Sequence, residues 1–565
     1  MPRNIKKLLK IKRNTYAALK KKQATKKEYQ KAEKAYKQAV KTSNARYEQK
    51  ISRSNNKNLL YGYMKKKLKS KNAIPPLRSE DGVTVTESKK KANLLNDAFQ
   101  SVYTHDDANL PILTAPCNNI TPMDWTVISP ADVQFAIKKL KMSVSRTPDD
   151  IPSIILKKCM YNLIIPLTML FNYSLSAKSL PKLWKEAIVI PIHKKGLKNS
   201  IKNYRPISLT SAICRVMETI LQHKLLEHFL NNNIINKNQY GFLPGKSTLS
   251  QHLDLIDQLT RNHDNKIHTE MIYLDFSKAF DRVSHQKLLH LLNQLKVDPQ
   301  IYNWIKNYLH ERRQRTVVED TFSAYSNITS GVPQGSVLGP TLFLIYVNNL
   351  INLLQEKVST SVKVYAFADD LKLLSNDTQE LQKSLDIIQN WTENWQLPLQ
   401  TAKSEQISFN SQKHNINLQQ TNKLKINGEL FNHTGIVKDL GLLLNNDLKW
   451  ANHIQNIQLK ANNISYMIIK TFKTRDPHMY ITLYKTYIRP IVEYNASIWS
   501  PYLIKDIIKA EYTQKKFTRQ ICKKLNLKYN NYLDRLRILK LESLEKRRLK
   551  LDLILVYKIL NNLIQ

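Results

Sequence analysis

Two stretches of the sequence, MIYLDFSKAFDRV (271–283) and VKVYAFADDLKLL (362–374), combine apolar runs with acidic residues. In the first stretch an apolar run ends at Asp275, and in the second apolar residues flank Asp369 and Asp370. Apolar runs on both sides of an Asp-Asp pair predict a tight β-hairpin with both carboxylates at its tip. We therefore expect two neighbouring strands whose ends carry acidic side chains.

A divalent cation explains such a group of acids. Ionised carboxylates beside buried strands are costly unless something neutralises them. Mg²⁺ prefers a few carboxylates together with phosphate oxygens and water. Three carboxylates from adjacent strands can hold two metal ions about 3.5–4 Å apart, the geometry of in-line phosphoryl transfer. The alternative for the Asp-Asp pair alone is an ordinary surface turn, because Asp favours turns.

A third stretch, SGVPQGSVLGPTLFLIYVNNL (330–350), is a Gly/Pro-rich loop that runs into an apolar helix. The chain has only 11 glycines, and three of them, Gly331, Gly335 and Gly339, fall within nine residues. We expect these glycines to let the backbone approach a nucleotide or a template closely. The amide of Gln334 would then hydrogen-bond that ligand. The alternative is a plain turn before a core helix.

The charge of the chain indicates a polyanionic partner. The 565 residues contain 88 Lys and Arg against 45 Asp and Glu, a net charge of +43. Residues 1–71 alone hold 24 Lys and Arg against three Glu, a net +21. Nucleic acid is the favoured partner and a membrane surface the second. The segment 1–71 is predicted to form long basic helices, with a solvated helical face or a disordered tail as the alternative.

Other features narrow the class of protein. The closest of the four cysteines are 42 residues apart, which excludes a zinc knuckle and argues against a disulfide scaffold. No run of 18 apolar residues is present, so we expect no membrane span. The loop signal IPPLRSEDG (74–82) follows the basic segment. The remaining pattern predicts a strand over 188–192, a helix over 284–295, a capped helix opening at 376–377, and basic helices after about 446.

The motifs LDFSKAFD, GVPQGSVLGP and YAFADD, in that order, resemble the reverse transcriptase of a non-LTR, LINE-type retrotransposon of the jockey-like kind. Further matches are NYRPISLTS (203–211), QYGFLPGKST (239–248), LGLLLNNDLKW (440–450) and YIRPIVEYNASIW (487–499). The resemblance implies an α+β fold of the right-hand polymerase type, whose palm is an antiparallel sheet with helices on one face. It divides the chain into a basic helical arm or linker (1–72), an extension leading into the fingers (73–172), fingers and palm (173–444) and a helical thumb or C-terminal region (445–565).

The resemblance also implies the roles of individual residues. Asp275, Asp369 and Asp370 would be the catalytic carboxylates that bind two Mg²⁺ ions, with Mn²⁺ as an alternative ion. Phe280 resembles the steric gate that disfavours a ribose 2′-hydroxyl, and a bulky ring is a simple way to reject one extra oxygen.

Six further residues follow from the same resemblance. The nucleotide would contact Lys195 (or Lys194), Arg205, Gln334 and Lys403, and the primer grip would contain Leu440 and Gly441. An ordinary solvated side chain is the alternative for each cation.

The implied activity is RNA-directed DNA synthesis from dNTPs on an RNA template with a DNA primer or target. The alternatives are a catalytically silent nucleic-acid-binding relic and an RNA-templated RNA polymerase, against which Phe280 argues. The implied location is the nucleus, with RNA binding beginning in the cytoplasm. Such elements normally carry an N-terminal endonuclease, and none is expected here, so the chain resembles a truncated element or a partial gene model.

The sequence departs from the family pattern in two places. The stretch SRTPDDIP (145–152) lacks two usual glycines, one before the proline and one after the first Asp, which puts the local turn in doubt. Gln400 replaces a usual Asn ahead of Lys403, which puts the loop assignment of that lysine in doubt.

Overall fold

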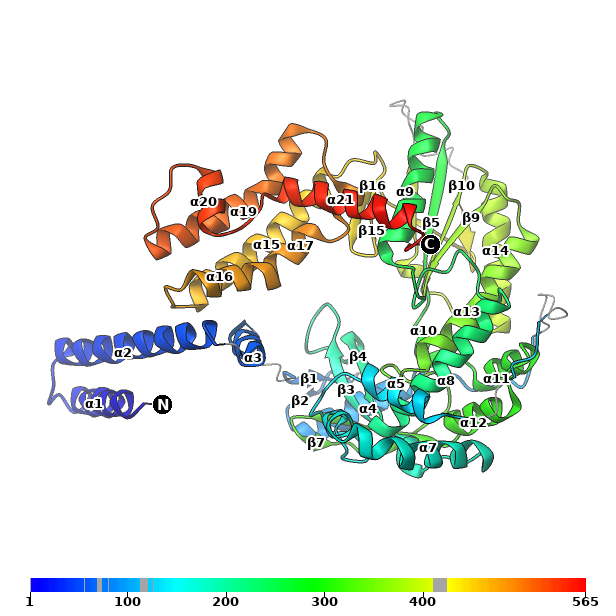
Figure 1. The fold of residues 1–565 in the computed structure, drawn as a ribbon, viewed down its shortest axis with the longest axis horizontal. Helices are drawn as coiled ribbons and strands as arrows, with labels where there is room; N and C mark the ends of the chain where they lie inside the picture. The colour runs from blue at the N-terminus through cyan, green and yellow to red at the C-terminus, as the bar shows by residue number, and fades with distance from the viewer. Residues whose placement is uncertain are drawn as a thin grey trace. The chain divides into compact units, whose positions relative to one another are not determined.

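The computed structural model describes residues 2–54, 56–68, 74–79, 81–111, 120–124, 127–409 and 424–564. Its fold is α+β, with many helices and several small sheets (Figure 1). The chain forms two compact units, which we call the helical unit (1–72, 438–445 and 449–563) and the sheet unit (73–437, 446–448 and 564–565). The predicted division into four segments is not tested by this grouping and stays a prediction.

The sheet unit contains most of the strands. They are β1 (Leu77–Arg78), β2 (Thr84–Val85), β3 (Glu186–His193), β4 (Tyr204–Leu209), β5 (Thr269–Asp275), β6 (Arg312–Val318), β7 (Thr321–Phe322), β8 (Ser326–Ile328), β9 (Lys363–Phe367), β10 (Asp370–Ser375), β11 (Glu405–Phe409), β12 (Lys425–Ile426), β13 (Glu429–Leu430) and β14 (Asn432–His433). Its helices are α4 (Ser88–Gln100), α5 (Pro130–Lys139), α6 (Ser153–Lys158), α7 (Met160–Ser176), α8 (Ala212–Asn231), α9 (Thr248–Asp264), α10 (Ala279–Arg282), α11 (His285–Gln294), α12 (Pro299–Leu309), α13 (Gly339–Lys357) and α14 (Thr378–Asn394).

The central sheet has the strand order β14-β11-β5-β10-β9, and its four strands from β11 to β9 are antiparallel. Strands β9 and β10 form a hairpin in which Phe367 pairs with Asp370, so that only Ala368 and Asp369 connect them. Ala368 has φ +57°, the left-handed conformation that two-residue hairpin turns use. The tight hairpin predicted from the sequence is confirmed.

Helices cover both faces of this sheet, whereas the sequence analysis expected them on one face. Leu371 and Leu373 of β10 join the main hydrophobic core with residues of α13 and α14. Lys372 lies between them and points to the other face, because side chains alternate along a strand. There its Nζ donates to Oε1 of Gln251 on α9 at 2.9 Å. The expectation of one covered face was wrong. The second face is covered through the buried polar contact of Lys372 with α9, which the apolar pattern of β10 does not indicate.

A second sheet has the order β4-β3-β6-β7, with β8 also paired to β6. Strand β3 contains the strand predicted over 188–192 and lies antiparallel to β4 and parallel to β6. Ile192 near the end of β3 pairs with Arg205 of β4. This sheet therefore fixes the backbone position of Arg205.

Local sequence signals determine where the predicted helices begin. Asp377 precedes α14, and its carboxylate accepts hydrogen bonds from the backbone N–H groups of Gln379 and Glu380 at 2.9 and 3.2 Å. Ser284 caps α11 in the same way. In the stretch 145–152, Asp150 adopts φ +50° where the family pattern has a glycine, so the turn forms without it.

The helical unit contains α1 (Arg3–Lys20), α2 (Lys26–Ser52), α3 (Lys57–Leu68), α15 (Ala451–Thr471), α16 (Pro477–Leu483), α17 (Arg489–Glu493), α18 (Ala496–Trp499), α19 (Ile504–Leu525), α20 (Tyr532–Ile538) and α21 (Leu544–Leu560). It also contains the short strand β16 (Leu442–Asn445), which pairs with β15 (Ile436–Asp439). The helices predicted in segment 1–71 and after 446 are thus present. Ile51, Leu60 and Met64 of the basic segment are buried in one hydrophobic core with residues of α15, α16 and α19.

A single buried acid joins the basic segment to the C-terminal helices. Glu48 of α2 is 0% exposed, and its carboxylate accepts hydrogen bonds from the backbone N–H groups of Lys473 and Thr474 at 2.7 and 2.8 Å. The Tyr63 hydroxyl donates to the same carboxylate at 3.0 Å. The end of α2 is therefore a packed part of the helical unit.

None of the described helices is long and apolar enough to cross a bilayer. The three cysteines in the described ranges, Cys159, Cys214 and Cys522, are all unpaired thiols, and Cys117 lies outside those ranges.

Candidate active site

The structure brings the three predicted carboxylates together. Asp275, the last residue of β5, lies directly opposite Asp370, the first residue of β10. Opposed residues of an antiparallel pair lie on the same face with Cβ atoms about 4.5–5.5 Å apart. Asp369 occupies the hairpin turn immediately before Asp370. Strand register alone thus gathers side chains that are far apart in the sequence.

The electrostatics of this group suit a cation. Burial raises the pKa of Asp369, and the nearby charge of Asp275 raises it further, while Arg205 and Lys194 act in the opposite direction. The Lys403 Nζ lies 3.2 Å from Oδ2 of Asp275. Within the described ranges, no three His, Cys, Asp or Glu side chains form a preformed metal cluster. The carboxylate oxygens of Asp275 and Asp369 are nevertheless the ligand type that Mg²⁺ takes together with substrate phosphates and water.

A cavity of about 810 Å³ in the sheet unit contains most of the predicted site. Two of the three carboxylates, Asp275 and Asp369, line it, while Asp370 is exposed beside them. The other predicted residues in its wall are Lys194, Lys195, Arg205, Phe280, Gln334 and Lys403. The arrangement can hold a triphosphate between cations and carboxylates. The roles of these residues stay predictions.

Leu440 and Gly441, predicted as the primer grip, belong to the helical unit. Both adopt positive φ, +40° for Leu440 and +101° for Gly441. A Cβ on Gly441 would approach the ring of Tyr494 to 3.1 Å, and the Tyr494 hydroxyl donates to the Leu440 carbonyl at 2.8 Å. This turn is therefore rigid, and its contact with a primer stays a prediction.

Phe280 is held by two other rings. It stacks on Phe343 of α13 with ring centroids 4.3 Å apart and planes 19° apart. The ring of Phe242 meets it nearly edge-on at 6.3 Å. A ring fixed in this way can form a hard wall of the cavity, as a steric gate requires.

The candidate phosphate-binding cations surround the carboxylates. Burial lowers the pKa of Lys194, and the neighbouring positive charges of Arg205 and Lys403 lower it further. The family-atypical Gln400 supports this region, because its backbone N–H donates to the Asp275 carbonyl at 2.7 Å and its side chain accepts from Lys403. The cluster thus carries closely spaced positive charges that an anionic substrate would relieve.

Two glycines of the 330–350 loop have a packing reason that was not predicted. A Cβ on Gly331 would lie 2.6 Å from the Asp281 carbonyl oxygen, and a Cβ on Gly335 would lie 2.5 Å from that of Ser208. Protein backbone therefore occupies the Cβ positions of both glycines, and the approach of a nucleotide or template to this loop stays a prediction. Gln334 also has an unexpected partner, because its amide donates to Asp281.

A buried glutamine that was not predicted as a site residue supports the turn of the Asp-Asp hairpin. Gln239 is fully buried, and its Oε1 accepts hydrogen bonds from the backbone N–H groups of Ala368 in the turn and of Gly241, at 3.0 and 2.8 Å. A Cβ on Gly241 would meet the Ala368 nitrogen at 2.5 Å. The signal in the sequence was Gly241 itself, two residues after Gln239, in a chain with only 11 glycines.

Comparison with known proteins agrees with this geometry. Residues 192–456 match the family model described as reverse transcriptase (RNA-dependent DNA polymerase). The RNA-directed DNA polymerase from mobile element jockey of Drosophila melanogaster is 30% identical over 368 residues, which cover 63% of this chain and 39% of that protein. The probable polymerases from transposon BS and transposon X-element of the same species are 28% and 27% identical and cover 67% and 71% of the chain. The chain spans about two fifths of the length of these relatives.

Carboxylates at the tip of a hairpin, beside a cation-lined cavity, fit the two-metal sites of phosphoryl-transfer enzymes, which include phosphatases, nucleases and polymerases. The matched region and the relatives point to the polymerases among these enzymes. Residues 192–456 thus match the reverse transcriptase family, and the chain is similar to the RNA-directed DNA polymerases of jockey and related transposons. Proteins of this family use divalent metal ions.

Proposed function

We propose that the chain is an RNA-directed DNA polymerase that transfers nucleotides from dNTPs to a primer 3′-hydroxyl on an RNA template. The observation that carries the proposal is the register pairing of Asp275 with Asp370, which puts Asp370 beside Asp275 and Asp369, the two acids that line the cavity. Phe280 in the same cavity favours dNTPs over ribonucleotides.

In this proposal Asp275 and Asp369, with Asp370 beside them, hold two Mg²⁺ ions, for which Mn²⁺ can substitute. When bound, the ions lower the pKa of the primer hydroxyl and stabilise the charge of the leaving pyrophosphate. Lys194 or Lys195 and Arg205 bind and orient the triphosphate, which places the α-phosphate in line for attack. Lys403 lies next to Asp275 and neutralises charge on the departing pyrophosphate.

We assign the domains of a right-hand polymerase to the chain. The central sheet with its hairpin forms the palm, and the fingers and palm together occupy 173–444. The helices after about 445 form the thumb, with Leu440 and Gly441 as the primer grip. The antiparallel strands β5, β10 and β9 and the cavity at their ends support the palm assignment.

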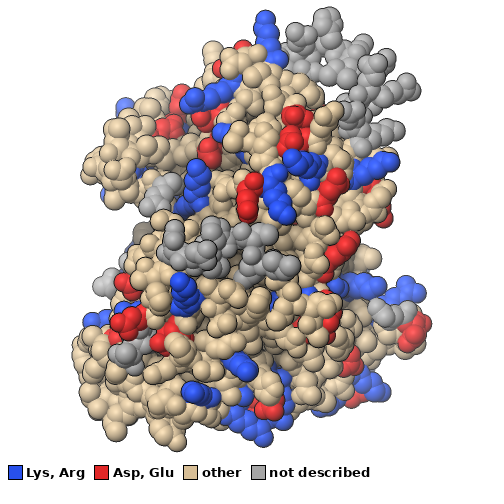
Figure 2. All heavy atoms as spheres, turned by 90° about the vertical axis from the view of Figure 1, so that its right-hand side faces the viewer, with Lys and Arg blue, Asp and Glu red and all other residues tan. Residues whose placement is uncertain are grey.

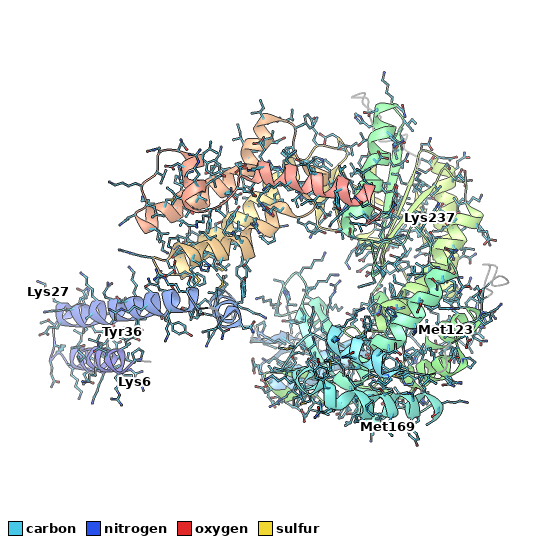
Figure 3. The ribbon with its side chains drawn as sticks, viewed as in Figure 1. Lys6, Lys27, Tyr36, Met123, Met169 and Lys237 are labelled. Atoms are coloured by element: carbon cyan, nitrogen blue, oxygen red, sulfur yellow. The ribbon has the colours of Figure 1, made fainter. Side chains whose placement is uncertain are left out.

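The nucleic-acid backbone is proposed to contact the basic segment. In Figure 3 the labelled Lys6 lies on α1, and Lys27 and Tyr36 lie on α2. Tyr36 faces α1, where Lys12 Nζ lies 5.6 Å from its ring centroid, so it is occupied by protein packing. The lysines remain as phosphate contacts. On the face drawn in Figure 2, by contrast, Lys and Arg are interspersed with Asp and Glu.

The decisive experiment is primer extension on an RNA template with Mg²⁺ and dNTPs. Wild type should extend the primer, and Asp369→Ala plus Asp370→Ala should abolish extension while nucleic-acid binding persists. Extension by the double variant would refute the metal-binding role. Binding without any synthesis by wild type would favour the silent relic, and extension with rNTPs alone would favour an RNA polymerase. Such synthesis on chromosomal DNA places the protein in the nucleus, with RNA binding beginning in the cytoplasm, and fractionation of expressing cells would test this.

A further inference from the structure

Asp281 and Gln334 share hydrogen bonds in the cavity wall that the proposed chemistry does not require. Gln334 Nε2 lies 2.8 Å from Oδ1 and 2.9 Å from Oδ2 of Asp281. An ionised carboxylate can only accept hydrogen bonds, so the NH₂ group of the amide must face it. The carbonyl oxygen of Gln334 then remains as an acceptor for another group in the cavity.

The backbones on both sides of this contact are fixed independently. The N–H groups of Gly331 and Val332 donate to the carbonyls of Val283 and Phe280, each at 2.8 Å. On the other side of the loop, the backbone N–H of Ser208 donates to the backbone carbonyl of Gln334 at 2.7 Å. These bonds fix the backbone of the loop, so only the side chain of Gln334 can turn. The hydrogen bonds to Asp281 determine the orientation of its amide group.

We propose that Asp281 is a positioning residue, which turns the Gln334 amide so that its carbonyl oxygen accepts a hydrogen bond from a donor group of the incoming nucleotide. The inference deepens the proposed function and rests on it. It also explains why an acid that binds no metal in the proposed mechanism lies in the wall of the cavity beside Phe280.

The charges around Asp281 make the contact sensitive to pH. Burial raises the pKa of Asp281 to about 6, although the Gln334 hydrogen bond and the charges of Lys278, Arg205 and Arg282 act in the opposite direction. Tyr103 also faces it, and burial together with the Asp281 charge raises the pKa of that phenol. Below about pH 6 the protonated carboxyl gains an O–H donor, which can pair with the Gln334 carbonyl oxygen and compete with the nucleotide.

The test compares wild type with Asp281→Asn in steady-state primer extension from pH 5.5 to 8. The asparagine amide can donate to Gln334, so the glutamine is no longer held in one orientation. We expect the KM for dNTP to rise about tenfold at pH 8, the loss that one charge-assisted hydrogen bond represents, with kcat within about threefold. The rise of KM that wild type shows on acidification through about pH 6 should be absent from the variant.

A second variant separates positioning from a general structural effect. Gln334→Met keeps the length of the side chain but removes both the donor and the acceptor. If Asp281 acts through Gln334, Asp281→Asn should raise the KM in the wild-type background and not in the Gln334→Met background. An equal rise in both backgrounds, or a melting temperature lowered in step with activity, would indicate a structural role and overturn the inference.

Different results would refute the positioning role of Asp281 and the proposed polymerase function. An active wild-type enzyme whose KM is unchanged by Asp281→Asn refutes the positioning role and leaves the proposed function intact. A folded wild type that extends no primer refutes both.

Discussion

Strand β5 carries an acidic side chain at each end, and the two ends have opposite environments. Near its start, Glu270 accepts hydrogen bonds from His268, Gln406 and Ser408 at 2.7, 3.0 and 2.7 Å. Burial alone would raise the pKa of Glu270, but these bonds outweigh it and leave the pKa below its ordinary value.

At the other end of β5, Asp275 lies beside a second and a third acid. Burial and the charge of Asp275 raise the pKa of Asp369, and together they outweigh a backbone hydrogen bond and the nearby cations that lower it. The same strand therefore shows that burial does not by itself mark a functional acid. A satisfied carboxylate stabilises the sheet, and carboxylates that crowd each other in a cavity leave charge for a ligand.

The largest effect is expected from a substitution of Asp369, which lies beside Asp275 and Asp370. Asp369→Asn should lower the kcat of primer extension by about 10³-fold or more, or about 4 kcal/mol, because a metal ligand is lost. Thermal unfolding with and without Mg²⁺ gives a readout independent of activity. Mg²⁺ should raise the melting temperature of wild type by binding the folded state, and should leave that of the variant nearly unchanged. Equal Mg²⁺ shifts in the two proteins would contradict the assignment.

A substitution of Glu270, whose carboxylate is fully hydrogen-bonded, should lower the stability of the fold. Glu270→Ala leaves Gln406 and Ser408 without a buried acceptor and His268 without its counter-charge, so we expect a loss of about 3 kcal/mol in the free energy of unfolding. Urea titration measures it. Glu270→Gln is the matched control and should lose less, because its amide oxygen still accepts. If Glu270→Ala were as stable as wild type, the contrast between the two ends would be wrong.

A smaller effect is expected from Phe280, the proposed steric gate, which lines the same cavity as Asp275 and Asp369. Phe280→Val removes the ring that Phe343 supports, and should raise the efficiency of rNTP relative to dNTP incorporation by about tenfold. The readout is the ratio of kcat/KM values for matched nucleotides. Phe280→Tyr keeps the ring and should preserve discrimination. An unchanged ratio in Phe280→Val would remove Phe280 from the specificity assignment.

The smallest effect is the pH dependence of the stability that the His268–Glu270 pair contributes. The hydrogen bond to Glu270 raises the pKa of His268. Protonation of His268 therefore stabilises the fold below its unfolded pKa of about 6.5, and this contribution is lost as pH rises through the raised folded value. The stability difference between wild type and His268→Gln should be present at pH 6 and should shrink towards pH 8.5, by less than about 1 kcal/mol. A difference that grows with pH would show that the pair is not charged as described.

Part of the site could be predicted because it depends on local pattern. The apolar runs around Asp369 and Asp370 required a hairpin, and Asp377 signalled the start of α14. The glycines at 331 and 335 were recognised as important, but their packing role could not be predicted, since the backbones of Asp281 and Ser208 that they accommodate are distant in sequence.

The basic segment shows the same limit. Its charge and helix propensity were evident, yet nothing in the sequence distinguished Glu48 from the other two glutamates of residues 1–71. Only folding buries Glu48 against the backbone of Lys473 and Thr474, about 425 positions away.

Local pattern was enough to predict the tight hairpin at Asp369 and Asp370 and the starts of α11 and α14, because strand alternation, helix capping and turn chemistry act over a few neighbouring residues. Only the tertiary structure decided which acid is satisfied and which is crowded, what Gln334 contacts, and where the glycines are needed. These properties depend on strand register and on packing between distant segments, and the free energy of a buried polar group is set by the partners that it meets there.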